Sequence, residues 1–156
     1  MTTALKEGDP ITSGPLLRFI PNWDKITWEY DKDRPSPRAW RERPGEDYVS
    51  IFLEGEDAAF TSVEALKKLK PDFAIYRVTA ETLIGLGNVT LQYKPVAEPE
   101  GHAHVGIFGI NRSRAEKLAR GLVPTERVKD PGPAAAPPSS DRTDDTPRDF
   151  WQGSPR

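Results

Sequence analysis

Prolines divide this sequence into two parts of different character. The chain has 156 residues and 16 prolines, and six of the prolines lie in the last 26 residues. The segment Pro131–Ser140 has too little apolar surface to offset the entropy of ordering its backbone, roughly 1–2 kcal/mol per residue. We therefore predict a single domain over residues 15–123, a flexible lead-in over residues 1–14, and a disordered, proline-rich tail over residues 124–156.

Within the predicted domain, short segments of different periodicity follow one another. Residues 25–30 alternate apolar and polar side chains, as in a half-buried strand, whereas residues 48–53 are apolar on both faces, as in a central strand. Further strands are predicted at 16–20, 73–78, 88–94 and 102–110. Because strands and helices follow no regular strand–helix–strand repeat, we predict an α+β fold. It would have a small mixed or mostly antiparallel sheet of about five to six strands and about two to four helices.

Capping patterns mark the predicted helices. A serine or threonine that is followed three residues later by glutamate is typical of a helix start, because both side chains satisfy unpaired backbone N–H groups. Serine before proline is a second such signal. These patterns predict short helices that begin after Ser36, Thr61 and Ser113, and Thr79 is predicted to cap another short helix through Ile84.

Composition excludes several classes of function. The chain has no cysteine, which excludes disulfides, thiolate catalysis and cysteine-bound zinc. The net charge of -2 gives no overall attraction to nucleic acid or to an anionic membrane. The longest apolar run, Val105–Ile110, is too short to span a bilayer, and the first residues lack an apolar signal segment. We expect a cytoplasmic protein with no membrane partner, and no motif indicates a cofactor.

The two histidines, His102 and His104, are two residues apart. On a strand they would point to the same face. Such a pair can ligate a metal, with Glu100 as a third ligand, or divide acid and base roles in phosphoester chemistry. The alternative is two exposed imidazoles at the junction of a loop and a strand. The chain lacks the acidic residues that continue the His-x-His patterns of cupins and amidohydrolases, so we assign no metal site and keep both histidines as candidate catalytic residues.

Arg18 and Ser50 each interrupt an apolar strand. A guanidinium there needs an anionic partner, from a ligand or from the chain itself, unless the strand lies at a sheet edge and Arg18 faces water. Ser50 either belongs to a site or bonds to the backbone. An arginine on an early strand and a serine on a following one resembles the order in ADP-ribosyltransferase-like folds. There a glutamate on a late strand completes the site, whereas Glu98 and Glu100 fall in a predicted loop here.

The segment Arg34–Arg43 places four arginines around Trp40. Basic residues beside an aromatic ring can bind single-stranded nucleic acid by phosphate contacts and stacking. However, residues 24–47 carry six basic and seven acidic side chains, a balance that favours a solvated surface with salt bridges. Nucleic-acid binding is therefore the weaker alternative.

Aromatic residues indicate a protein partner. Trp23, Trp28 and Trp40 lie within eighteen residues of one another, and form either a satellite core or a binding surface. Phe150 and Trp151 stand isolated in the polar tail, as the anchors of a short linear motif do. The leading hypothesis is a small accessory domain that binds another protein through these residues. The alternative is a small enzyme that acts on a nucleotide or nucleic acid through Arg18, Ser50, His102 and His104.

Overall fold

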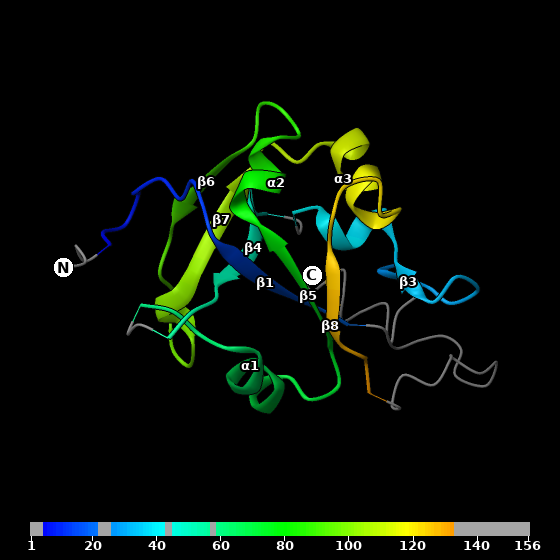
Figure 1. Ribbon diagram of the computed structural model, residues 1–156, viewed down its shortest axis with the longest axis horizontal. Coiled ribbons are helices and arrows are strands. Elements are labelled where there is room, and N and C mark those ends of the chain that lie inside the picture. Colours follow the sequence, from blue (N-terminus) through cyan, green and yellow to red (C-terminus); the bar gives the residue numbers. More distant parts are fainter. Residues whose placement is uncertain (1–4, 22–25, 43–44, 57–58, 133–156) are drawn as a thin grey trace.

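A six-stranded antiparallel sheet forms the centre of the molecule (Figure 1). The computed structural model describes residues 5–21, 26–42, 45–56 and 59–132. The strands are β1 (Pro15–Ile20), β2 (Trp28–Glu29), β3 (Arg34–Pro35), β4 (Val49–Leu53), β5 (Ala74–Thr79), β6 (Thr90–Tyr93), β7 (His104–Phe108) and β8 (Glu126–Lys129). The helices are α1 (Val63–Leu69), α2 (Ala80–Ile84) and α3 (Arg112–Ala119), with 3-10 turns η1 (Pro37–Trp40) and η2 (Gly101–Ala103). The predicted α+β class is confirmed.

The sheet order is β6-β7-β4-β1-β5-β8, and β2 pairs only with β3. Strand β1 therefore lies in the interior of the sheet, with Leu16 opposite Leu53 of β4 on one side and opposite Val78 of β5 on the other. This position excludes the prediction of an edge strand for Arg18. Strand β4 lies between β1 and β7, as its apolar faces predicted.

The core follows from this order. The interior strands β1, β4 and β7 supply side chains that are almost fully removed from water, including Leu16, Ile51 and Val105. Burying such side chains contributes about 1.5–3 kcal/mol each. Trp28 and Trp40 are only 1% exposed and belong to the same core.

The helices cover the two ends of the central strands, with α1 at one end and α2 and α3 at the other (Figure 1). Two of the predicted caps differ from the observed ones. Helix α1 is capped by Ser62, whose hydroxyl accepts from the Ala65 N–H, because Thr61 makes a β-bridge to Glu54. Helix α3 is capped by Asn111 instead of Ser113, whereas Thr79 caps α2 as predicted. No helix in the described part of the chain is long and apolar enough to cross a membrane.

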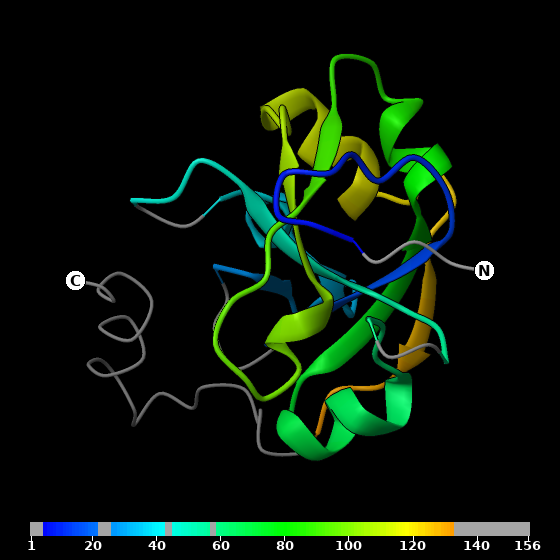
Figure 2. The ribbon, with the colours of Figure 1, turned by 90° about the vertical axis from the view of Figure 1, so that its left-hand side faces the viewer.

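The ordered domain is larger than the predicted range of 15–123. Strand β8 pairs with β5 along one edge of the sheet, as Figure 2 shows. At the opposite edge, the segment from Gly8 to Ile11 follows β6: the Gly8 N–H donates to the Tyr93 carbonyl and the Ile11 N–H donates to the Leu91 carbonyl. Both predicted boundaries thus fall inside the folded region, while residues 133–156 of the predicted tail lie outside the described residues.

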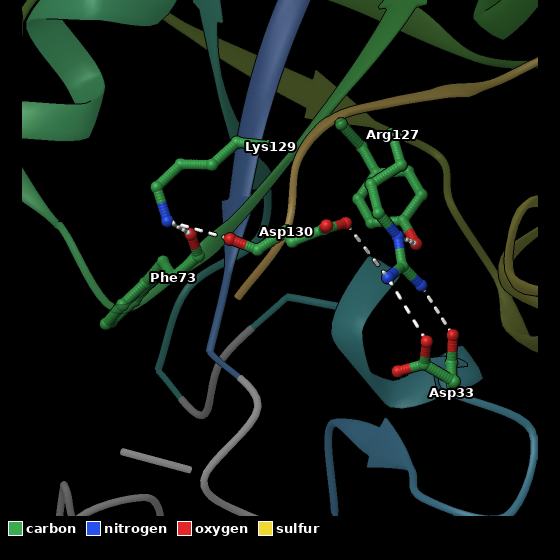
Figure 3. Close-up of polar contacts among 6 residues, drawn as sticks. Asp33, Phe73, Arg127, Lys129 and Asp130 are labelled. Carbon is green, nitrogen blue, oxygen red and sulfur yellow. Dashed lines mark hydrogen bonds and ion pairs between the residues drawn. The ribbon is translucent and has the colours of Figure 1, made fainter. Parts of the chain in front are cut away.

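Side chains hold β8 in place (Figure 3). The Arg127 guanidinium donates to the Tyr76 hydroxyl at 2.9 Å and to the Asp33 carbonyl, and it stacks between the Trp28 and Tyr76 rings. The Lys129 ammonium donates to the carbonyls of Pro71 and Phe73, both at 2.8 Å. The charged side chains Arg127 and Lys129 therefore attach strand β8 to the rest of the domain through specific polar contacts.

Candidate functional site

Three of the four predicted catalytic residues line one cavity. Arg18 comes from β1, Ser50 from β4 and His104 from β7, and these three strands are neighbours in the sheet. The cavity has a volume of about 360 Å³. We call it the Ser50 cavity. Since the strand order could not be read from the sequence, this convergence is a finding of the structure.

Ser50 and His104 form a hydrogen-bonded pair. The Ser50 Oγ lies 2.9 Å from His104 Nε2, and His104 Nδ1 lies 2.7 Å from the carbonyl oxygen of Lys94. A carbonyl oxygen can only accept, so Nδ1 carries the proton and, in the neutral ring, Nε2 accepts from the Ser50 hydroxyl. A hydroxyl, a base and a third group that orients the base are the elements of an activated nucleophile.

The surroundings of His104 keep it neutral. His104 is only 3% exposed, and burial lowers the pKa of its imidazole below the ordinary value of 6.5. The rings of Tyr48 and Phe52 meet it edge-on, with centroids 5.8 and 5.4 Å away. A neutral imidazole has a free lone pair at pH 7, so His104 is in the protonation state that a general base requires.

Arg18 places a positive charge beside Ser50. Its Nη1 donates to the Ser50 carbonyl at 2.6 Å, its Nε and Nη2 both donate to the Ala39 carbonyl, and its Cζ lies 5.7 Å from the centroid of the Trp40 ring. These carbonyls hold the guanidinium in a fixed orientation. A fixed cation at this position can stabilise negative charge that develops at a group bound near the Ser50 hydroxyl.

The remaining lining combines cations with aromatic rings. Among the described residues, Arg41 and Lys70 add two positive side chains to Arg18, against one carboxylate, Glu46. Four rings also line the Ser50 cavity: those of Phe19, Tyr48, Phe52 and Phe73. Phe19 and Phe52 stack with centroids 5.3 Å apart and planes inclined by 26°. The cavity therefore suits a ligand that has both an anionic group and a planar ring.

His102 does not belong to this site. It lies in η2 and not on β7; its Nδ1 is 3.1 Å from Glu98 Oε1, and its Nε2 is 3.0 Å from the Phe60 carbonyl. The hydrogen bond that the His102 ring donates to the Glu98 carboxylate raises the pKa of His102. The prediction that the two histidines share one face of a strand is wrong, because the strand begins only at His104. Among the described residues, no group of three His, Asp or Glu side chains could hold a metal ion.

The predicted partner-binding residues are distributed differently. Trp28 and Trp40 are buried in the core, so their rings do not form an exposed surface in this fold. Trp23, Phe150 and Trp151 lie outside the described residues, and binding of a protein through the tail stays a prediction. In the predicted nucleic-acid segment, Arg34 pairs with Glu29 at 2.8 Å and Arg41 with Glu42 at 3.4 Å.

Sequence reasoning missed two parts of the site. The carbonyl of Lys94 orients His104, but a backbone group leaves no mark in the residue pattern. Lys70 follows α1 directly and was assigned no role. No protein family, curated protein or solved structure matches this chain, so the geometry alone indicates what the site does.

Proposed function

We propose that this protein is an enzyme that acts on a phosphate ester of nucleotide type, with Ser50 as nucleophile and His104 as general base. One observation carries the proposal. Ser50 and His104 line a cavity together with Arg18, and hydrogen bonds connect the Ser50 Oγ through the His104 ring to the Lys94 carbonyl. The distance of 2.9 Å between His104 Nε2 and the Ser50 Oγ lies within the range of about 2.6–3.2 Å that is typical of activated serines.

The proposed chemistry needs no group beyond the substrate and water. The Ser50 Oγ attacks phosphorus while His104 Nε2 takes the hydroxyl proton. The bond from phosphorus to the leaving oxygen breaks, and the imidazolium returns the proton to that oxygen. Water then attacks the phosphoserine in the same way and releases phosphate, which regenerates the Ser50 hydroxyl. Arg18 stabilises the negative charge on the phosphoryl oxygens in both steps.

The substrate class follows from the lining. The three cations Arg18, Arg41 and Lys70 favour a phosphate, and the aromatic rings favour a base or another planar group that packs against them. A nucleotide carries both. A carboxylate ester without a ring would leave the aromatic part of the Ser50 cavity unused.

A fluorophosphonate probe tests the nucleophile without knowledge of the substrate. Attack by the Ser50 Oγ forms an O–P bond, fluoride leaves, and the proton passes to His104. Mass spectrometry of the intact protein and its peptides should find one phosphonyl group on Ser50. Because loss of a general base costs about 10²–10⁴-fold in rate, His104→Asn should label more slowly by that factor.

The controls separate chemistry from folding. Ser50→Ala should not be labelled, whereas Ser113→Ala, which removes an exposed hydroxyl on α3, should label like the unaltered protein. His104→Asn keeps an amide N–H that can donate to the Lys94 carbonyl, and thermal melting will show whether it folds. Labelling that is absent, or that occurs equally in the Ser50→Ala protein, would refute the proposed nucleophile.

A further inference from the structure

A second cavity, of about 350 Å³, lies between η1 and α3. Three arginines line it: Arg38 and Arg41 from the region of η1, and Arg112 from the first turn of α3. We call it the arginine groove. Among the described residues of its lining, Glu116 is the one carboxylate against three arginines, which gives this part of the groove an excess of positive charge.

Two of these guanidiniums have no partner within the described part of the chain. The guanidiniums of Arg38 and Arg112 make no hydrogen bond or ion pair to any described residue, whereas that of Arg41 pairs with Glu42 at 3.4 Å. By contrast, the arginines that stabilise the fold are fully engaged: Arg77, for example, makes bonds of 2.6 and 2.7 Å to both carboxylate oxygens of Glu54. Arg38 and Arg112 are thus available to an external anion.

The groove adjoins the Ser50 cavity at Arg41, which lines both. The two cavities differ in one respect. The Ser50 cavity has aromatic walls, whereas the described residues that line the arginine groove include no aromatic side chain. The groove can therefore recognise a phosphate but offers no stacking surface for a base.

We infer that the arginine groove binds a second phosphate of the substrate whose reacting phosphate and ring occupy the Ser50 cavity. This inference rests on the proposed function. It narrows the substrate to a ligand with at least two phosphates, either adjacent ones, as in a nucleoside diphosphate, or ones separated by a sugar, as in an oligonucleotide. Guanidiniums suit this role because they bind phosphate oxygens through two parallel N–H bonds.

Calorimetric titration of the Ser50→Ala protein tests the groove without turnover. The ligands are thymidine 5′-monophosphate, thymidine 5′-diphosphate and the 5′-phosphorylated thymidine dinucleotide. Arg38→Gln and Arg112→Gln should each raise the Kd of at least one two-phosphate ligand about tenfold, the loss expected for one charge-assisted bond. The Kd of the monophosphate should change less than about twofold. Which of the two ligands responds identifies the spacing of the phosphates.

Arg120→Gln is the matched control, because Arg120 is an exposed arginine at the end of α3 outside the groove. Equal weakening of all three ligands, an equal effect of Arg120→Gln, or no binding of either two-phosphate ligand would overturn the inference. A negative result for the arginine groove can be told apart from a negative result for Ser50 as nucleophile. If the probe labels Ser50 but the groove variants do not discriminate, only the groove is refuted. If the groove variants weaken only a two-phosphate ligand but the probe does not label Ser50, the groove is supported as a phosphate site and the proposed nucleophile is refuted.

Discussion

The fold shifts the pKa values of His102 and His104 in opposite directions. His104 is buried, and burial lowers its pKa, whereas the bond to Glu98 raises the pKa of His102. Both hydrogen-bond partners of His102 are acceptors, which the charged imidazolium satisfies with two N–H donors. Two histidines that are two residues apart in the sequence thus have pKa values shifted in opposite directions.

This difference predicts opposite pH effects on stability. As the pH falls, the unfolded chain takes up a proton at His104 near pH 6.5, whereas the folded protein does so only at a lower pH. The stability that His104 contributes above pH 6.5 is therefore lost as the pH falls through the lowered pKa of the folded state. His102 contributes stability that is complete below pH 6.5 and is lost as the pH rises through its raised pKa. Urea unfolding at pH 5 and pH 8 measures both. His102→Gln should destabilise more at pH 5, and His104→Asn more at pH 8. Equal losses at both pH values would contradict the assignment.

The sequence located the side chains of the candidate site better than their surroundings. Arg18 and Ser50 stand out because each is a polar residue within an apolar strand, and His104 because histidine is rare in this chain. Their partners could not be predicted. The Arg18 guanidinium bonds to the carbonyls of Ala39 and Ser50, and backbone acceptors are present at every residue, so the residue pattern cannot say which of them a side chain will meet.

Among the elements, strand β8 shows where periodicity fails. The strands with alternating or continuous apolar residues were predicted, to within a few residues. Strand β8 has the sequence Glu-Arg-Val-Lys, with one apolar residue, and lies at a sheet edge. It forms because β5 offers an unpaired backbone edge and because Arg127 and Lys129 bind groups from distant segments. Such contacts depend on the tertiary fold and leave no local signal.

Truncation tests the contribution of β8. A chain that ends at Val123 loses β8 and exposes the edge of β5, whereas a chain that ends at Gly132 keeps every described contact. We expect the shorter chain to melt about 10 °C lower or more, the scale of roughly 3 kcal/mol for a domain of this size. The chain ending at Gly132 should melt like the full chain. Equal melting temperatures for both truncated chains would show that β8 adds nothing to stability.

At the scale of the whole molecule, strand order decides which residues meet. The sequence predicted the class of fold but not the order β6-β7-β4-β1-β5-β8, because all of its pairings except β6–β7 and β1–β4 join strands between which the chain forms another strand of the sheet. Antiparallel pairing of apolar strands satisfies many orders about equally well. The convergence of β1, β4 and β7, and with it the candidate site, therefore required the three-dimensional structure.

The extent of the fold also changes how the tail prediction must be tested. A deletion that begins at residue 127 would remove most of β8 and confuse unfolding with loss of a binding motif. Deletion of residues 133–156 avoids this. If Phe150 and Trp151 anchor a protein partner, this deletion should abolish co-purification of that partner and leave fluorophosphonate labelling of Ser50 unchanged. Association that survives the deletion would refute the tail as the binding element.

The interior position of β1 has a consequence for synthesis on the ribosome. Its neighbours, β4 and β5, begin at Val49 and Ala74, so the first strand to leave the ribosome is completed on both sides only after Thr79 has followed. Until then the apolar side chains of Leu16, Leu17 and Ile20 have no core to enter. In the nascent chain this strand stays open to chaperones and to aggregation until its neighbours have formed, and slower translation of residues 49–79 would prolong that exposure.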